Sequence, residues 1–512
     1  MMRTMNSGNR ALASHPLLSP PYPPCMKSLR SRLHRLTYVA PSTQSWYGAP
    51  PPQHSARGGS DTAPHVGHGQ LPVEVCKEIF RRAAPIPTSF ARQDADSMRD
   101  IARAAYCFAA TCRHWRDVAH KTPELWQFIY CRIDSVSSTK RFVTYVRTNL
   151  RRSAGKPLYI VMHTIGDAGV FMRLNDTRFL DEMYDLLAKE VYRWRRCLFE
   201  VHGFIAERLY ESLRGATLFL EELIMLPPQG YRDAPLLVEW DEVAGTRDAG
   251  ILPAAPSLRR LESHVACAVP MDSLRRLTYL SISLRDGSSE EPLWHFLKQT
   301  PALTELHVYF STDMTRYGEE ASPSDEITLP NLEILGVYGI PGGAEAFYWL
   351  NMPRLRTLVV SAEWCWALQP LCAAVSRMVK HVVITSVEVV EKVGTYLRGY
   401  DADALSPLLN VETIELRGLL EDTLDSDDLK GFFAHLHTHF PRLRRLLVSN
   451  CRFRLAACRP ISDFVQWRQA QSQPFKLSFV NTVLARTSRK PLSWYNAFVA
   501  SQFAGANIED TF

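Results

Sequence analysis

The sequence lacks the features that identify several classes of protein. No apolar run approaches the roughly 18 residues that a membrane-spanning helix needs, so we expect no contact with the membrane interior. No C-x-x-C pair occurs, and the 11 cysteines are scattered as singlets, which fits neither a zinc ribbon nor a disulfide framework. We therefore expect reduced, mostly buried cysteines in a cytoplasmic or nuclear protein.

Sequence motifs of catalysis are also missing. The chain contains no G-x-S-x-G, G-x-G-x-x-G, P-loop or H-E-x-x-H. Three histidines form the run HLHTH (His435, His437 and His439), but without a supporting Cys or carboxylate they indicate a solvent-facing helix edge. We expect no catalytic residue, no metal and no cofactor, hence no enzyme. The alternative of a hydrolase or transferase hidden in 155–485 stays open, and it would require a deep pocket with perturbed titratable groups.

Acidic residues are absent from residues 1–60, which carry seven Lys and Arg residues. The whole chain is +6, so residues 61–512 carry 6 − 7 = −1. A near-neutral body argues against a nucleic-acid-binding protein. Residues 1–67 are rich in Pro, Gly and Ser and are predicted to be a disordered tail. Their Arg-rich character also resembles a mitochondrial transit peptide, which remains an alternative.

Helical periodicity begins at Leu71. The run LPVEVCKEIFRRAA places apolar residues on one helical face after Pro72. A second helix is predicted from about Met98 to Cys112, and a turn, a short helix and the break at Pro123 follow. Residues 68–131 are therefore predicted to form a small all-α module.

The order of residues in this module resembles the F-box, in the F-box-like form common in large fungal families. The resemblance is carried by Leu71-Pro72, Ile79-Phe80, Cys112-Arg113-x-Trp115-Arg116-Asp117-Val118-Ala119 and Thr122-Pro123-x-Leu125-Trp126. The loop between the first two helices is longer than in compact F-boxes. The resemblance implies a three-helix module that binds the Skp-type adaptor of cullin–RING ubiquitin ligases. The implied adaptor-binding residues are Leu71, Pro72, Ile79, Phe80, Cys112 and Trp115.

An apolar-x-x-apolar-x-apolar pattern then recurs along the chain. Its copies start at Leu220, Leu258, Leu277, Leu303, Leu332, Leu355, Val379, Val411 and Leu443. The pattern resembles leucine-rich repeats, in which each strand and its return segment are buried against the neighbouring units. Residues 155–485 are predicted to form an irregular α/β solenoid, with strands also expected at 156–163, 195–203 and 474–481. A non-repeating α/β domain is the alternative.

Residues between the apolar positions of each strand are expected to line one face of the solenoid. Tyr and His gather there, and Tyr supplies contact area at low entropic cost. The candidate target-binding residues are Tyr279, His307, Tyr309 and Tyr338, with Glu305, Thr357 and His381 on the same face.

The sequence therefore predicts an α/β protein of five segments: a tail (1–67), an F-box-like module (68–131), a helical linker (132–154), the solenoid (155–485) and a C-terminal tail (486–512). The predicted function is that of a substrate-recognition subunit of a Skp–cullin–F-box ubiquitin ligase. Its expected partners are the Skp-type adaptor, the cullin and a protein target. An interaction scaffold without a role in ubiquitin transfer is the alternative.

Overall fold

The chain divides by its contacts into two units in the computed structural model. The structure describes residues 71–90, 95–133, 136–164, 178–200, 213–226, 252, 254–263, 274–284, 296–310, 326–338, 347, 350–361, 369–385, 405–418, 426–453, 458–471, 475–480, 483–484 and 507–511. Within these ranges, unit 1 holds residues 71–86 and 95–125, and unit 2 holds 87–90 and the rest. The predicted tail 1–67 lies outside the described residues.

The described part of unit 1 contains three helices, α2 (Val73–Ala83), α3 (Ala95–Thr111) and α4 (Arg113–His120), and the 3₁₀ turn η1 (Pro123–Trp126) follows α4. A small aromatic core joins the helices. Phe80 and Phe108 stack with ring centroids 4.3 Å apart, and the Trp115 ring meets Phe80 edge-on at 5.1 Å. Phe80 and Phe108 are completely buried. Each helix thus supplies one ring to the core of unit 1.

Local chemistry fixes where two of these helices begin. The Pro72 carbonyl accepts the Cys76 N–H at 3.0 Å, and proline itself has no N–H to leave unpaired there. Cys112 is the N-cap of α4, where its Sγ accepts the Trp115 N–H at 3.4 Å. Both residues therefore have a structural role at a helix start.

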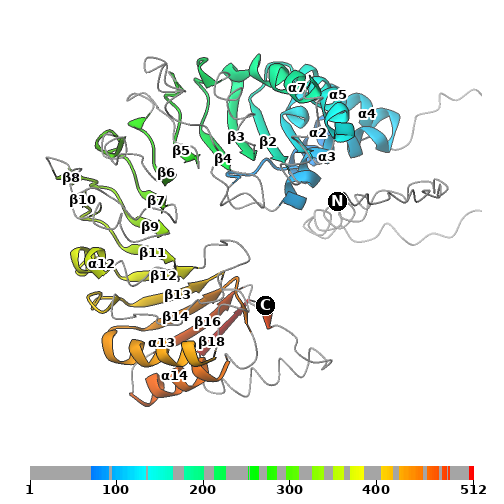
Figure 1. Ribbon diagram of the computed structural model, residues 1–512. Helices are drawn as coiled ribbons and strands as arrows, with labels where there is room; N and C mark the ends of the chain where they lie inside the picture. Colours follow the sequence, from blue (N-terminus) through cyan, green and yellow to red (C-terminus); the bar gives the residue numbers. More distant parts are fainter. Residues whose placement is uncertain are drawn as a thin grey trace, which may run out of the picture. The chain divides into compact units, whose positions relative to one another are not determined.

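Unit 2 is built on one sheet of 14 parallel strands that lie side by side in chain order (Figure 1). Its strands are β1 (Phe128–Ile133), β2 (Leu158–Thr164), β3 (Trp194–Glu200), β4 (Glu222–Leu226), β5 (Arg260–Ser263), β6 (Tyr279–Leu284), β7 (Glu305–Phe310), β9 (Ile334–Tyr338), β11 (Thr357–Ser361), β12 (His381–Thr385), β13 (Thr413–Arg417), β14 (Arg445–Ser449), β16 (Lys476–Val480) and β18 (Asn507–Thr511). Two short parallel pairs lie apart from it: β8 (Ile327–Thr328) with β10 (Leu350–Asn351), and β15 (Arg452–Phe453) with β17 (Val483–Leu484).

The predicted repeats stand in register across this sheet. Apolar residues pair from strand to strand and are all buried, forming the series Leu261, Leu280, Leu306, Leu335, Leu358, Val382, Ile414, Leu446 and Leu477. This order of parallel neighbours is the topology of a leucine-rich-repeat solenoid and confirms the predicted α/β repeat architecture.

A proline-containing turn precedes several of these strands. The carbonyls of Thr300, Leu329, Met352 and Phe440 accept the N–H three residues later, at 3.1–3.3 Å. Proline follows each of these four residues, at the second turn position, where its fixed φ favours the turn. These prolines therefore set how the chain enters β7, β9, β11 and β14.

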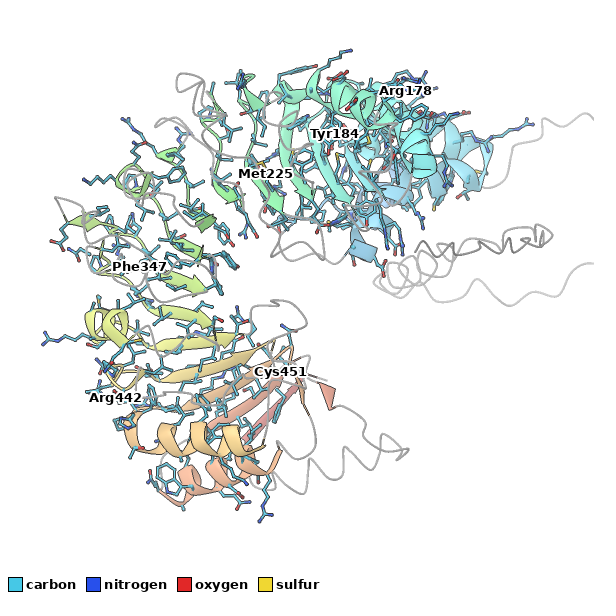
Figure 2. All side chains as sticks on the ribbon, viewed as in Figure 1. Arg178, Tyr184, Met225, Phe347, Arg442 and Cys451 are labelled. Carbon is cyan, nitrogen blue, oxygen red and sulfur yellow. The ribbon has the colours of Figure 1, made fainter. Side chains whose placement is uncertain are left out.

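Helices cover one face of the sheet. They are α5 (Val136–Arg152), α7 (Arg178–Ala188), α12 (Gln369–Val375), α13 (Ser426–His439) and α14 (Cys458–Ala470), with the 3₁₀ turn η2 (Val191–Arg193). Figure 1 shows α13 and α14 lying together beside the last strands. One continuous apolar cluster joins this face to the helices, and Tyr184, Met225, Phe347 and Cys451, labelled in Figure 2, all belong to it.

The unit boundaries differ from those expected from the sequence. Strand β1 and helix α5 lie in the predicted module and linker, yet β1 pairs with β2 and α5 packs on β1, so the sheet begins before residue 155. Strand β18 pairs with β16 inside the predicted C-terminal tail. The segment 87–90 belongs to unit 2 although its neighbours in sequence belong to unit 1. These assignments depend on contacts between residues distant in sequence, and such contacts cannot be read from the periodicity of apolar residues.

Two buried arginines close the C-terminal ends of helices in unit 2. Arg468 on α14 is 1 % exposed and donates to the carbonyls of Leu436 (3.2 Å) and Phe440 (2.6 Å) at the end of α13. Arg193 donates to the Leu150 carbonyl at 3.3 Å, near the end of α5, and to Ser153 Oγ at 2.9 Å. Each guanidinium satisfies acceptors that the last turn of a helix leaves open.

We predict that Arg468→Ala lowers the free energy of unfolding by about 2–4 kcal/mol, because two buried carbonyls lose their donor and the packing on Phe464 is lost. Arg459→Ala, an exposed arginine of the same helix, is the matched control and should have little effect. Urea unfolding followed by circular dichroism measures both. Equal stabilities of the two variants would contradict the role assigned to Arg468.

Candidate binding surface on the open face of the sheet

The side chains that alternate with the apolar series point to the face of the sheet opposite the helices, which we call the open face. The structure brings all four predicted target-binding residues together there. Tyr279 lies on β6, His307 and Tyr309 on β7, and Tyr338 on β9, with the pairs Ser281–His307 and Tyr309–Tyr338 in register between them. Glu305, Thr357 and His381 lie on the same face of their strands.

The rings of these residues form a stack across the strands. The rings of Tyr309 and Tyr338 are nearly parallel, with centroids 4.3 Å apart. The centroid of the His307 ring lies 5.8 Å from that of Tyr338 and 5.5 Å from that of Tyr279. At the far end the Arg260 guanidinium covers the Tyr279 ring at 3.2 Å. Because the rings cover one another's faces, a partner would meet mainly ring edges and hydroxyl groups.

Hydrogen bonds hold the middle of the stack. His307 Nε2 lies 2.8 Å from a Glu305 oxygen, and Nδ1 lies 2.9 Å from the Tyr338 hydroxyl. With the Nε2 proton donated to Glu305, Nδ1 accepts the Tyr338 proton. Burial raises the pKa of Tyr279 and of Tyr338 above the ordinary value, so both hydroxyls stay neutral and act as hydrogen-bonding groups. The cluster suits recognition, not nucleophilic chemistry.

Gly336 makes room for this arrangement. A Cβ at this position would lie 2.2 Å from His307 Nδ1 and 3.0 Å from a Tyr338 ring carbon. No side chain other than hydrogen fits while His307 keeps its place. The sequence alone does not reveal the role of Gly336, since this role depends on which residue lies beside it on the next strand.

A second polar cluster, also missed apart from His381, lies on β12 to β14. The Glu415 carboxylate accepts two bonds from Arg417 (2.7 and 3.0 Å) and one from Ser449 Oγ (2.5 Å), with His381 Nε2 at 3.5 Å. Burial opposes ionisation of Glu415, but the bonds from His381, Arg417 and Ser449 prevail and lower its pKa to about 2. Three strands are thereby joined by one carboxylate.

The open face of the first strands is occupied by the segment Pro87–Phe90. Ser89 Oγ and the Phe90 N–H donate to the Glu222 carboxylate at 2.6 and 3.2 Å. Arg196 donates to the Pro87 carbonyl at 2.6 Å, and the fully covered Phe90 ring meets Phe128 edge-on at 5.7 Å. The long loop noted in the sequence thus behaves as a polypeptide bound to the sheet of unit 2.

The predicted adaptor-binding residues occupy different environments in unit 1. Phe80 is fully buried, and Ile79 and Trp115 are half-buried against the same core. Leu71, Pro72 and Cys112 are exposed. Phe80 therefore supports the module from inside and offers no surface to a partner in this conformation. Val73 and Val75, in the first turn of α2, are exposed as well.

Neither a metal site nor a membrane helix emerges from the described ranges. Among these residues no three His, Cys, Asp or Glu groups gather closely enough to hold an ion. Helix α13 carries the HLHTH run, but the side chains of His435 and His437 lie outside the described residues. None of the described helices combines the length and apolarity needed to cross a bilayer.

Comparison with known proteins gives little to add. No protein-family model matches the sequence, and no curated protein matches it significantly. Among solved structures, the chain aligns with an internalin of Listeria monocytogenes at 11 % identity and a TM-score of 0.26, over 82 % of this chain and 94 % of that one.

Gly336→Ala should displace His307 and break its bond to Tyr338, lowering the free energy of unfolding by about 1–3 kcal/mol because the added methyl group has no room. Gly431→Ala, on α13 with open space around its Cα, should be neutral or stabilising. Urea unfolding and the near-ultraviolet circular dichroism of the tyrosines report on both. An unchanged tyrosine signal in Gly336→Ala would contradict this account.

A dependence of stability on pH follows from Glu415. Its folded-state pKa of about 2 lies below the ordinary value of 4.5, so its contribution is fully present above about pH 4.5 and is lost as the pH falls toward 2. Between these values the melting temperature of the wild type should fall more steeply than that of Glu415→Gln. Parallel melting curves for the two proteins would refute the assignment.

Proposed function

We propose that the chain is the substrate-recognition subunit of a Skp–cullin–F-box ubiquitin ligase. Unit 1 binds the Skp-type adaptor and the open face of unit 2 binds a protein target. The proposal is supported by the F-box-like order of residues from Leu71 to Trp126 and by the three helices that these residues form around one small core. The repeat sheet that follows supplies a broad surface of the kind that solenoid proteins use for binding.

The observation that carries the proposal is the exposure of three large apolar side chains at the start of α2. Leu71, Val73 and Val75 are 41, 38 and 43 % exposed, whereas Phe80 further along the helix faces the core. A module of about 50 residues buries little surface of its own, and large apolar side chains left exposed on it mark a protein contact. The resemblance to the F-box indicates that the protein bound at these side chains is the Skp-type adaptor.

In this role the protein positions the two reactants and contributes no reacting group of its own. The scaffold brings a charged ubiquitin-conjugating enzyme near a lysine of the bound target, which raises the effective concentration of the two reactants. The Tyr and His stack suits such a role, because the raised pKa values of Tyr279 and Tyr338 keep their hydroxyls protonated and able to form hydrogen bonds. A stable target complex would bury roughly 1,200–2,000 Å² in total.

The double variant Leu71→Asp/Val75→Asp should abolish co-purification of the adaptor while the far-ultraviolet circular dichroism stays unchanged, because both side chains are exposed. Leu409→Asp, which changes an exposed leucine in unit 2, is the control and should retain the adaptor. Pull-down from cells with detection of the adaptor and the cullin measures the effect.

Failure of the wild type to retain the adaptor would overturn the proposal. Retention of the adaptor without any target that becomes longer-lived on depletion of this protein would favour the alternative of an interaction scaffold.

A further inference from the structure

The row of open-face positions that holds Pro87–Phe90 does not end at β4. Phe128, Tyr159, Arg196 and Glu222 pair in register on β1 to β4. The same row continues through Arg260 and Tyr279 to Glu305 on β5, β6 and β7. Charged and aromatic side chains, the types that contact Pro87–Phe90, therefore continue in this row on β5, β6 and β7.

The way the segment is held shows what this row recognises. Glu222 accepts a hydroxyl proton and a backbone N–H, and Arg196 donates to a backbone carbonyl, so both charges bind main-chain or small polar groups of a polypeptide. On the continuation the charged residues of the row are Arg260, which is ion-paired with Glu222 and Glu262 at 3.3 Å, and Glu305, which lies 2.8 Å from His307. The Tyr279 ring lies between them in the row, so an extended polypeptide would meet a donor and an acceptor two strands apart instead of one.

The charge on this part of the open face selects among polypeptides. On β5 to β9 the described open-face residues comprise two carboxylates, Glu262 and Glu305, and one guanidinium, Arg260, so the balance is 1 − 2 = −1. Carboxylates beside aromatic rings attract ammonium and guanidinium groups. The whole chain, by contrast, carries +6. The sign of this surface is opposite to that of the protein.

We propose that β5 to β9 of the open face bind an extended basic segment of the target, as a continuation of the row that holds Pro87–Phe90. The inference rests on the proposed function, because a substrate receptor binds a polypeptide. Lysine or arginine side chains of the target lie against Glu262 and Glu305, and its main chain bonds with Arg260 and the tyrosine hydroxyls.

The test uses the full chain and two fluorescein-labelled decapeptides of Gly and Ser, one with two lysines and the other with two glutamates at the same positions. Fluorescence anisotropy should show at least tenfold tighter binding of the lysine peptide, with affinity falling as salt rises. Attraction to the net charge of the chain would favour the glutamate peptide instead. Equal binding, a preference for glutamate, or no binding of either peptide would overturn the proposal.

The double variant Glu262→Gln/Glu305→Gln should weaken binding of the lysine peptide about tenfold. Glu333→Gln, which makes the same chemical change at an exposed position just before β9, should leave it unchanged. Equal affinities of the two variants would also overturn the proposal. Both variants should still retain the adaptor, so a protein that binds the lysine peptide but not the adaptor refutes only the ligase role.

Discussion

Each repeat of unit 2 can bury its apolar strand positions only if the next repeat stacks beside it in register. The series from Leu261 to Leu477 meets this requirement, with every member buried. The open face is a consequence, because fixing the apolar positions toward the helices sends the intervening side chains to the other side. The register therefore decides which Tyr, His and Glu residues become neighbours, although they are about 20–30 residues apart in sequence.

Charged side chains are used inside this framework in two ways. Arg193 and Arg468 are buried against helix ends, where carbonyl groups would otherwise lack donors. Glu415 is buried on the open face, where Arg417 and Ser449 satisfy it. In both cases burial of the charged group is tolerated because hydrogen bonds satisfy it. Each of these charged side chains also links neighbouring helices or strands.

The repeat pattern was sufficient to predict the strands, their order and the open-face position of Tyr279, His307, Tyr309 and Tyr338, since these follow from alternation along each strand. It did not reveal β1, which spans the boundary between the predicted module and linker, or β18 in the predicted C-terminal tail. It also did not reveal Gly336, whose role depends on the ring beside it. Nor did it separate Phe80 from Leu71, because helical spacing does not tell a residue that closes a core from one that remains exposed. The F-box resemblance stays a prediction, to be tested through the adaptor.

Ser89 and its carboxylate partner Glu222 are 133 positions apart, which bears on how the chain is synthesised. The segment leaves the ribosome well before β4, so Ser89 and the Phe90 N–H lack their carboxylate acceptor until four strands exist. Contacts of such long sequence separation form late and slow the assembly of the domain that contains them. We expect nascent chains shorter than about 220 residues to leave this segment without its partner and open to chaperones.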